Sequence, residues 1–98
     1  MAKRGVKKKQ FRPDFGVFVC PHVQDGANVL EVVRDSEGDW QFRCGDAEAD
    51  SDADLILVAV GDVLAADPSL AVSVELDIST GIERKATYKD WDSFTVEE

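Results

Sequence analysis

Histidine and cysteine, which supply most transition-metal ligands and many catalytic nucleophiles, are scarce in this chain, with one histidine and two cysteines. A glycine-rich phosphate loop is also missing from the sequence, because Gly61 and Gly81 each stand alone. These shortages leave no recognisable catalytic signature. We therefore expect a protein that is not an enzyme and that needs no cofactor.

Long hydrophobic runs are missing as well. The longest, from Leu55 to Val60, has six residues, whereas a membrane-spanning helix needs about 18. No apolar segment follows the basic N-terminus, as it would in a secretory signal. We expect a cytoplasmic protein with no membrane partner, whose cysteines stay reduced.

Acidic residues are absent from the first twelve residues, which carry six Lys and Arg side chains. The rest of the chain holds all twenty acids and only five bases, so its formal charge is −15. Such a body repels nucleic acids and attracts basic proteins. We predict a flexible basic tail over residues 1–12 and a single domain over 13–98, and we do not expect nucleic acid as a partner.

Three segments rich in β-branched and aromatic residues occupy the N-terminal half of the domain. The predicted strands are 15–20 (continuing to 23), 29–34 and 40–44. The Asp25-Gly26 pair is typical of a tight hairpin, and a second turn spans residues 35–39. Short turns between consecutive strands predict an antiparallel three-stranded meander.

The C-terminal half is predicted to supply short helices and a returning strand over 82–88. Residues 55–60 could be a buried strand or the start of a helix, and because Gly61 interrupts them we predict a short buried segment followed by a short helix over 62–66. Pro68 should end that helix after Asp67, and Ser69 could cap the next turn. The predicted fold class is α+β, an antiparallel sheet of about four to five strands with one or two short helices on one face.

The best-defined local pattern is the strand 40–44 and the acids that follow it. Trp40, Phe42 and Cys44 point to one side of this strand, and the residues between them point to the other. Five acids then occupy every second position: Asp46, Glu48, Asp50, Asp52 and Asp54. The run lacks the glycine and glutamate positions of a calcium loop. We interpret it either as a solvated loop or as a docking surface for Lys and Arg.

Cys20, His22 and Cys44 support an alternative hypothesis. Cys20 and His22 share one face if the first strand continues, and Cys44 lies on another predicted strand. Their spacing differs from that of common zinc sites, so we favour structural roles and assign no metal ligand. The alternative function is a small metal-binding or thiol-using module built on these three residues.

Three parts of the sequence, read in order, resemble a bacterial family of small domains of unknown function. The first is the Asp-Gly segment over 25–34, and the second is the tryptophan strand with its glycine and acidic loop over 38–46. The third combines the Asp-Pro turn over 67–70 with a Gly-x-Glu-Arg segment over 79–84. Some members of that family are described as immunity-type proteins encoded beside polymorphic toxins. The resemblance implies an inhibitor and carries over no catalytic residue.

Charge and resemblance together lead to one hypothesis. The chain is a non-enzymatic, acidic protein-binding module with a basic, toxin-like protein as its partner. The predicted contact residues are the following: Trp40, Asp46, Glu48, Asp50, Asp52 and Asp54. The exposed side of the Trp40 strand completes this surface, and the sequence leaves the oligomeric state open.

Overall fold

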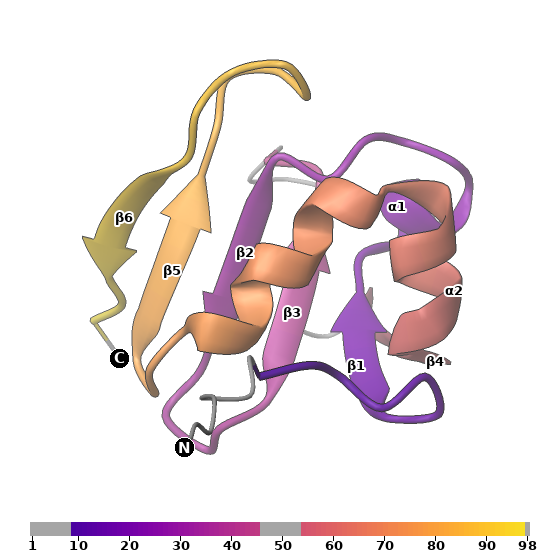
Figure 1. Ribbon diagram of the computed structural model, residues 1–98, viewed down its shortest axis with the longest axis horizontal. Helices are drawn as coiled ribbons and strands as arrows, with labels where there is room; N and C mark the ends of the chain where they lie inside the picture. Colours follow the sequence, from indigo (N-terminus) through magenta and orange to yellow (C-terminus); the bar gives the residue numbers. More distant parts are fainter. Residues whose placement is uncertain (1–8, 46–53, 98) are drawn as a thin grey trace, which may run out of the picture.

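The computed structural model defines residues 9–45 and 54–97, which form an α+β fold around one six-stranded mixed sheet (Figure 1). The strands are β1 (Gly16–Val19), β2 (Glu31–Arg34), β3 (Trp40–Arg43), β4 (Ile56–Ala59), β5 (Thr80–Glu83) and β6 (Asp92–Thr95). The helices are α1 (Pro21–Gln24), α2 (Val60–Ala66) and the 3-10 helix η2 (Pro68–Glu75). Within these ranges no helix combines the length and apolar character needed to cross a membrane.

The sheet order is β4-β1-β3-β2-β5-β6, and α2 and η2 lie in front of it in Figure 1. A compact apolar core fills the space between the sheet and the helices. Its most deeply buried side chains are Val17, Val19, Val32, Phe42, Val60 and Leu70. Burying one such side chain contributes about 1.5–3 kcal/mol to folding. The predicted α+β class is confirmed, and the sheet has six strands rather than the four or five expected.

The predicted antiparallel meander is wrong at its first strand. β1 pairs in parallel with β3 and antiparallel with β4. β2 pairs antiparallel with β3, so β3 separates β1 from β2 in the sheet. The connection from β1 to β2 is therefore a crossover that contains α1, and the sheet is mixed rather than antiparallel.

The Asp25-Gly26 pair ends a helix instead of forming a hairpin. Pro21 occupies the first turn of α1, where its missing N–H is not needed. Gly26 has a φ of 107°, and the N–H groups of Gly26 and Ala27 donate to α1 carbonyls at 3.0 and 2.8 Å. This pattern is the Schellman motif that terminates helices at glycine. The predicted extension of the first strand to Val23 is consequently replaced by α1.

The hairpin between β2 and β3 is confirmed. Asp35 Oδ1 accepts hydrogen bonds from the backbone N–H groups of Glu37 and Asp39 at 2.9 and 3.0 Å. Gly38 supplies the positive φ, 90°, that closes the turn. The turn brings the acidic side chains of residues 35, 37 and 39 close together beside the sheet.

The predicted order of an apolar segment followed by a helix is confirmed in β4 and α2, although α2 begins at Val60. Pro68 opens η2 as expected. The cap is Asp67 rather than Ser69, because the Asp67 side chain accepts from the Ser69 N–H at 3.1 Å. Gly61 in α2 lies against the chain before β1 and donates its N–H to Pro13 O at 2.9 Å.

The folded domain extends further toward the N-terminus than the predicted boundary at residue 13. Phe11 is half-buried, and its ring meets the Trp40 ring edge-on with 5.2 Å between centroids. Phe15 contacts the same indole at 5.7 Å. Phe11, which the sequence places in the tail, therefore packs against the core.

Arg84 joins the end of β5 to three other segments. Its side chain is 1% exposed, and it bonds Val29 O at 2.9 Å and Asp67 Oδ2 at 2.7 Å. It also donates to Ser69 Oγ at 2.9 Å, and its guanidinium lies 4.2 Å from the centre of the Trp91 ring. These contacts fix η2 and the loop before β2 to the sheet.

Candidate protein-binding site

Trp40 is a core residue that links β3 to the helix layer. It is 8% exposed, and its Nε1 donates to Ser73 O at 2.7 Å. The Arg34 guanidinium lies 4.3 Å from the centre of its ring. Because its indole is enclosed by these contacts, Trp40 does not belong to a contact surface as the sequence hypothesis required.

The acidic run is described by the structure only at its last member. Four of the predicted contact residues lie outside the described ranges: Asp46, Glu48, Asp50 and Asp52. Asp54 is exposed and stands two residues before β4. The described part of the acidic run is thus one carboxylate near an edge of the sheet.

The alternative site built on two cysteines and the histidine is only partly assembled. Cys44 Sγ lies 3.9 Å from His22 Nδ1, whereas Cys20 is fully buried. No disulfide joins the two cysteines. Within the described ranges these three side chains do not place their ligand atoms close enough together to share one metal ion. The structure therefore brings Cys44 close to His22 but does not bring all three ligand atoms together, and the alternative function built on them stays a hypothesis.

The face of the sheet opposite the helices, here named the second face, carries a polar network. The strand residues whose side chains lie on this face include Phe18, Val33, Gln41, Arg43, Leu57 and Phe94. Gln41 Nε2 donates to Asp35 Oδ2 at 3.1 Å, and Arg43 Nη2 donates to Gln41 Oε1. Arg43 Nη1 also lies 3.7 Å from Glu31 Oε1. The network holds these polar groups in fixed orientations across β2 and β3.

An acidic hollow of about 460 Å³ lies on the second face next to the β2–β3 turn. Phe18 and Leu55 give it an apolar floor, and the carboxylates of Asp35, Glu37 and Asp39 border it. Oxygen atoms of these three carboxylates lie within 4.8 Å of one another. Negative charges this close repel, so a cation placed between them is stabilised. The apolar floor suits the aliphatic stem of a Lys or Arg side chain.

A second hollow of about 400 Å³ lies across Gln41 on the same face. Val33 and Phe94 supply its apolar surface, and Glu31 and Glu97 supply carboxylates. The guanidinium of Arg43 lies near Glu31 here, so this hollow is less negative than the acidic hollow. The second face thus alternates aromatic surface with charge, as protein interfaces often do.

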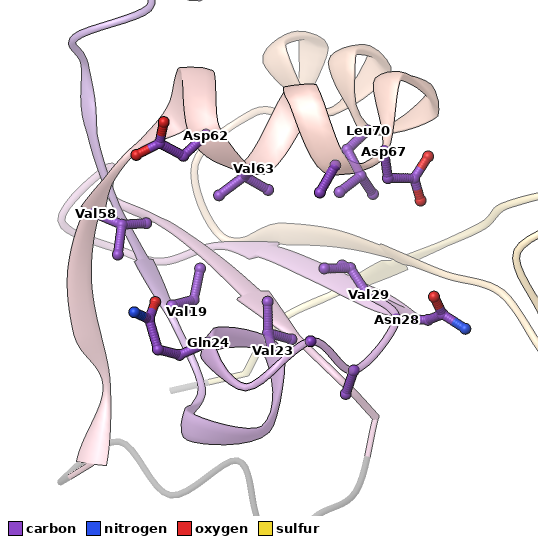
Figure 2. A pocket seen from close by; sticks show the side chains of 13 residues that line it. Val19, Val23, Gln24, Asn28, Val29, Val58, Asp62, Val63, Asp67 and Leu70 are labelled. Atoms are coloured by element: carbon purple, nitrogen blue, oxygen red, sulfur yellow. The ribbon is translucent and has the colours of Figure 1, made fainter.

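A groove on the helix side of the sheet has a volume of about 410 Å³ (Figure 2). Its apolar lining comprises Val19, Val23, Val29, Val58, Val63, Ala66 and Leu70. Figure 2 shows Asp62 and Gln24 at the end nearest Val58, and Asn28 and Asp67 at the other end. The groove is therefore an apolar channel with one carboxylate at each end.

The two carboxylates of the groove differ in their availability to a partner. Partial burial opposes ionisation of Asp67, but hydrogen bonds from Ser69 and Arg84 outweigh it, so the pKa of Asp67 lies below its usual value. Its negative charge is already engaged by Arg84 at 2.7 Å. Asp62 is exposed on α2 and is the carboxylate that an incoming cation can reach.

The sequence pattern indicates one part of this surface clearly and another part less directly. The period-2 alternation correctly separated Gln41 and Arg43 from Trp40. The acids at positions 35, 37 and 39 were interpreted only as a turn, although they too occupy every second position. That spacing, directly before a strand, was the signal that could have placed three carboxylates together.

The described surface offers carboxylates beside aromatic and aliphatic groups, an arrangement suited to recognising Lys and Arg side chains. Its two hollows and its groove lie on opposite faces of the sheet. Comparison of the chain with protein-family models, with curated proteins and with solved structures gives no match.

Proposed function

We propose that this chain is a non-enzymatic, acidic protein-binding module whose partner is a basic protein. The observation that carries the proposal is the acidic hollow. Three carboxylates there approach within 4.8 Å of one another beside the ring of Phe18, on a sheet face without a described helix over it. A Lys or Arg side chain of a partner would relieve the repulsion among them.

The charge of the whole chain supports the same kind of partner. The formal net charge is −9, and the residues after the basic N-terminal segment carry −15. A field of this sign speeds the encounter with a basic protein and slows the encounter with acidic ones. Within this proposal, the resemblance to immunity-type proteins makes the partner a toxin that the module inhibits.

The test compares charge removal at the acidic hollow with equal charge removal elsewhere. The site variant is Glu37→Gln with Asp39→Asn, whose backbone N–H bonds to Asp35 are retained. The matched control is Glu75→Gln with Asp77→Asn, because these exposed acids lie at the end of η2. Each protein is immobilised and exposed at low salt to lysate of the source organism, and bound proteins are quantified by mass spectrometry.

We expect a basic protein to be retained by the parent and by the control variant, and to be reduced about tenfold on the site variant. The association rate of the purified partner should fall with added salt, and it should fall less for the site variant. Equal capture by all three proteins would contradict the assignment of the acidic hollow as the contact site.

A further inference from the structure

We propose that the outer edge of β4 binds an extended segment of the partner protein as an added strand, and that basic and apolar side chains alternate along this segment. The inference rests on the proposed function and specifies how the basic partner is held. Strand addition of this kind takes affinity from main-chain hydrogen bonds and specificity from alternate side chains.

The backbone of β4 has hydrogen-bonding groups directed away from the sheet. Among the described strands only β1 pairs with β4, so β4 forms one border of the sheet. The Val60 N–H donates to Phe15 O at 2.8 Å, so Val60 and Phe15 are a hydrogen-bonded pair of the antiparallel ladder. Because hydrogen-bonded and non-hydrogen-bonded pairs alternate in an antiparallel ladder, Val58 and Ile56 bond to β1. Leu57 then directs its N–H and C=O outward.

The side chains of β4 lack the features that usually prevent an exposed edge from pairing with another strand. Exposed edges are usually protected by Lys, Pro or a bulge, and β4 has none of these in the sequence Ile-Leu-Val-Ala. Leu57 is 66% exposed on the second face. The opposite border, β6, has polar side chains at three of its four positions. The two borders of the sheet therefore differ, and β4 is the one suited to a partner.

The two faces at the β4 edge would select different side chains. On the helix side, Val58 lies at the end of the groove where Asp62 and Gln24 stand (Figure 2). A Lys or Arg beside Val58 could lay its stem on the apolar lining and place its charge near Asp62. On the second face, an apolar side chain would cover exposed Leu57. A segment with alternating basic and apolar residues satisfies both faces.

The negative charges near β4 favour a basic partner protein, rather than a second copy of this chain, as the occupant of the β4 edge. Asp54 lies before β4 and Asp62 follows it, and both are exposed. Two copies aligned along β4 would bring these acids toward one another, and each copy carries a net charge of −9. Like charges that approach across an interface oppose association. A basic segment is attracted by the same acids.

The probe is a capped synthetic peptide of about nine residues that alternates Lys and Val. A second peptide has the same sequence and charge, with N-methyl groups on backbone nitrogens of both edges, so that neither edge can donate hydrogen bonds to a strand. Only the first can form a β-ladder along β4, so the pair separates strand addition from general attraction between opposite charges. Binding is followed by titration of the isotope-labelled protein in solution.

Two variants of the protein complete the test. Leu57→Lys places a positive charge on the edge at an exposed position, and Val72→Lys adds the same charge at an exposed apolar residue on η2. Thermal unfolding and spectra of the free proteins show whether both variants keep the parent fold. Hydrogen exchange at the Leu57 and Val58 amides is measured with and without the peptide.

We expect the parent and Val72→Lys to bind the unmodified peptide with similar affinity, and Leu57→Lys and the N-methylated peptide to reduce binding about tenfold. The Leu57 amide should exchange more slowly when the peptide is bound. Equal binding of both peptides, or of both variants, would overturn the inference. So would self-association of the parent that Leu57→Lys abolishes, because the occupant would then be a second copy. None of these outcomes depends on the Glu37 and Asp39 variant, so the proposed function is judged separately.

Discussion

Arg84 shows how one side chain can determine the arrangement of several segments in a small domain. All five of its N–H donors have acceptors, namely Val29 O (twice), Ser69 Oγ, Thr87 O and Asp67 Oδ2. A buried guanidinium is tolerated because it is both paired and fully hydrogen-bonded. The Asp-Pro turn and the Gly-x-Glu-Arg segment meet at this arginine. Their contact is therefore structural.

The pairing of Asp67 with Arg84 makes stability depend on pH. Because the pKa of Asp67 is lowered in the folded state, its ionised form stabilises the fold above the unfolded pKa of about 4. This contribution is lost as the pH falls through the lower, folded pKa. We expect Asp67→Asn to be about 1–3 kcal/mol less stable than the parent at neutral pH. The difference should shrink as the pH falls below about 4.

Urea unfolding of the parent and Asp67→Asn, from neutral pH down to about pH 2, measures this difference. Asp62→Asn is the matched control, since it removes an exposed carboxylate from the other end of the same groove. A stability gap for Asp67→Asn that stays constant across the acidic range would show that ionisation of Asp67 is not linked to folding.

At the scale of elements, local sequence signals identified turns more reliably than they identified strand partners. The β2–β3 hairpin was predicted correctly because the Asp35 side chain organises the turn by itself. The Asp25-Gly26 pair was misinterpreted, since Asp-Gly suits both a hairpin turn and a helix C-terminus. Pro21 was the signal that favours a helix start, since proline fits a first turn but lacks the N–H of a strand interior.

Gly61 tests whether a contact between elements outweighs helix propensity. Replacing glycine by alanine in a helix usually adds about 1 kcal/mol of stability. A Cβ at this position in α2 would lie 2.9 Å from Pro13 O and 3.2 Å from Pro13 Cβ. Backbone atoms must move to relieve that contact, so we expect Gly61→Ala to destabilise the protein by about 1–3 kcal/mol.

Chemical denaturation of Gly61→Ala and the parent gives this value. Ala65→Gly, at an exposed position of the same helix, serves as the calibration because it changes propensity without a close contact. If Gly61→Ala were more stable than the parent, the approach of α2 to the segment before β1 would be looser than the 2.9 Å hydrogen bond from Gly61 to Pro13 indicates.

At the scale of the whole molecule, the sequence predicted the fold class but not the topology or the contact surface. Composition and alternation were sufficient for an α+β domain, because they reflect which side chains avoid water. The parallel pairing of β1 with β3 depends on long-range packing that no local window contains. The acidic hollow likewise requires that the turn at Asp35 and the β1 residue Phe18 meet across the sheet.

The excess of negative charge predicts opposite effects of salt on folding and on partner binding. With a net charge of −9, the folded chain repels itself, and added salt screens that repulsion. We expect the urea midpoint to increase between about 0.02 and 0.5 M NaCl, by an amount equivalent to about 1 kcal/mol. Over the same range, association with a basic partner should slow, because the attraction that speeds encounter is screened as well.

Both effects can be measured on one protein preparation, by urea titration and by stopped-flow association with the basic partner or the Lys-Val peptide. The partly buried Arg84–Asp67 pair should contribute little to the salt dependence, because partly buried pairs are screened less than exposed charges. The Glu75→Gln, Asp77→Asn variant has two fewer negative charges than the parent and an unaltered acidic hollow, so its urea midpoint should respond less to salt than that of the parent. Salt that lowered the midpoint would mean that attractive pairs, rather than self-repulsion, dominate the electrostatics of the folded chain.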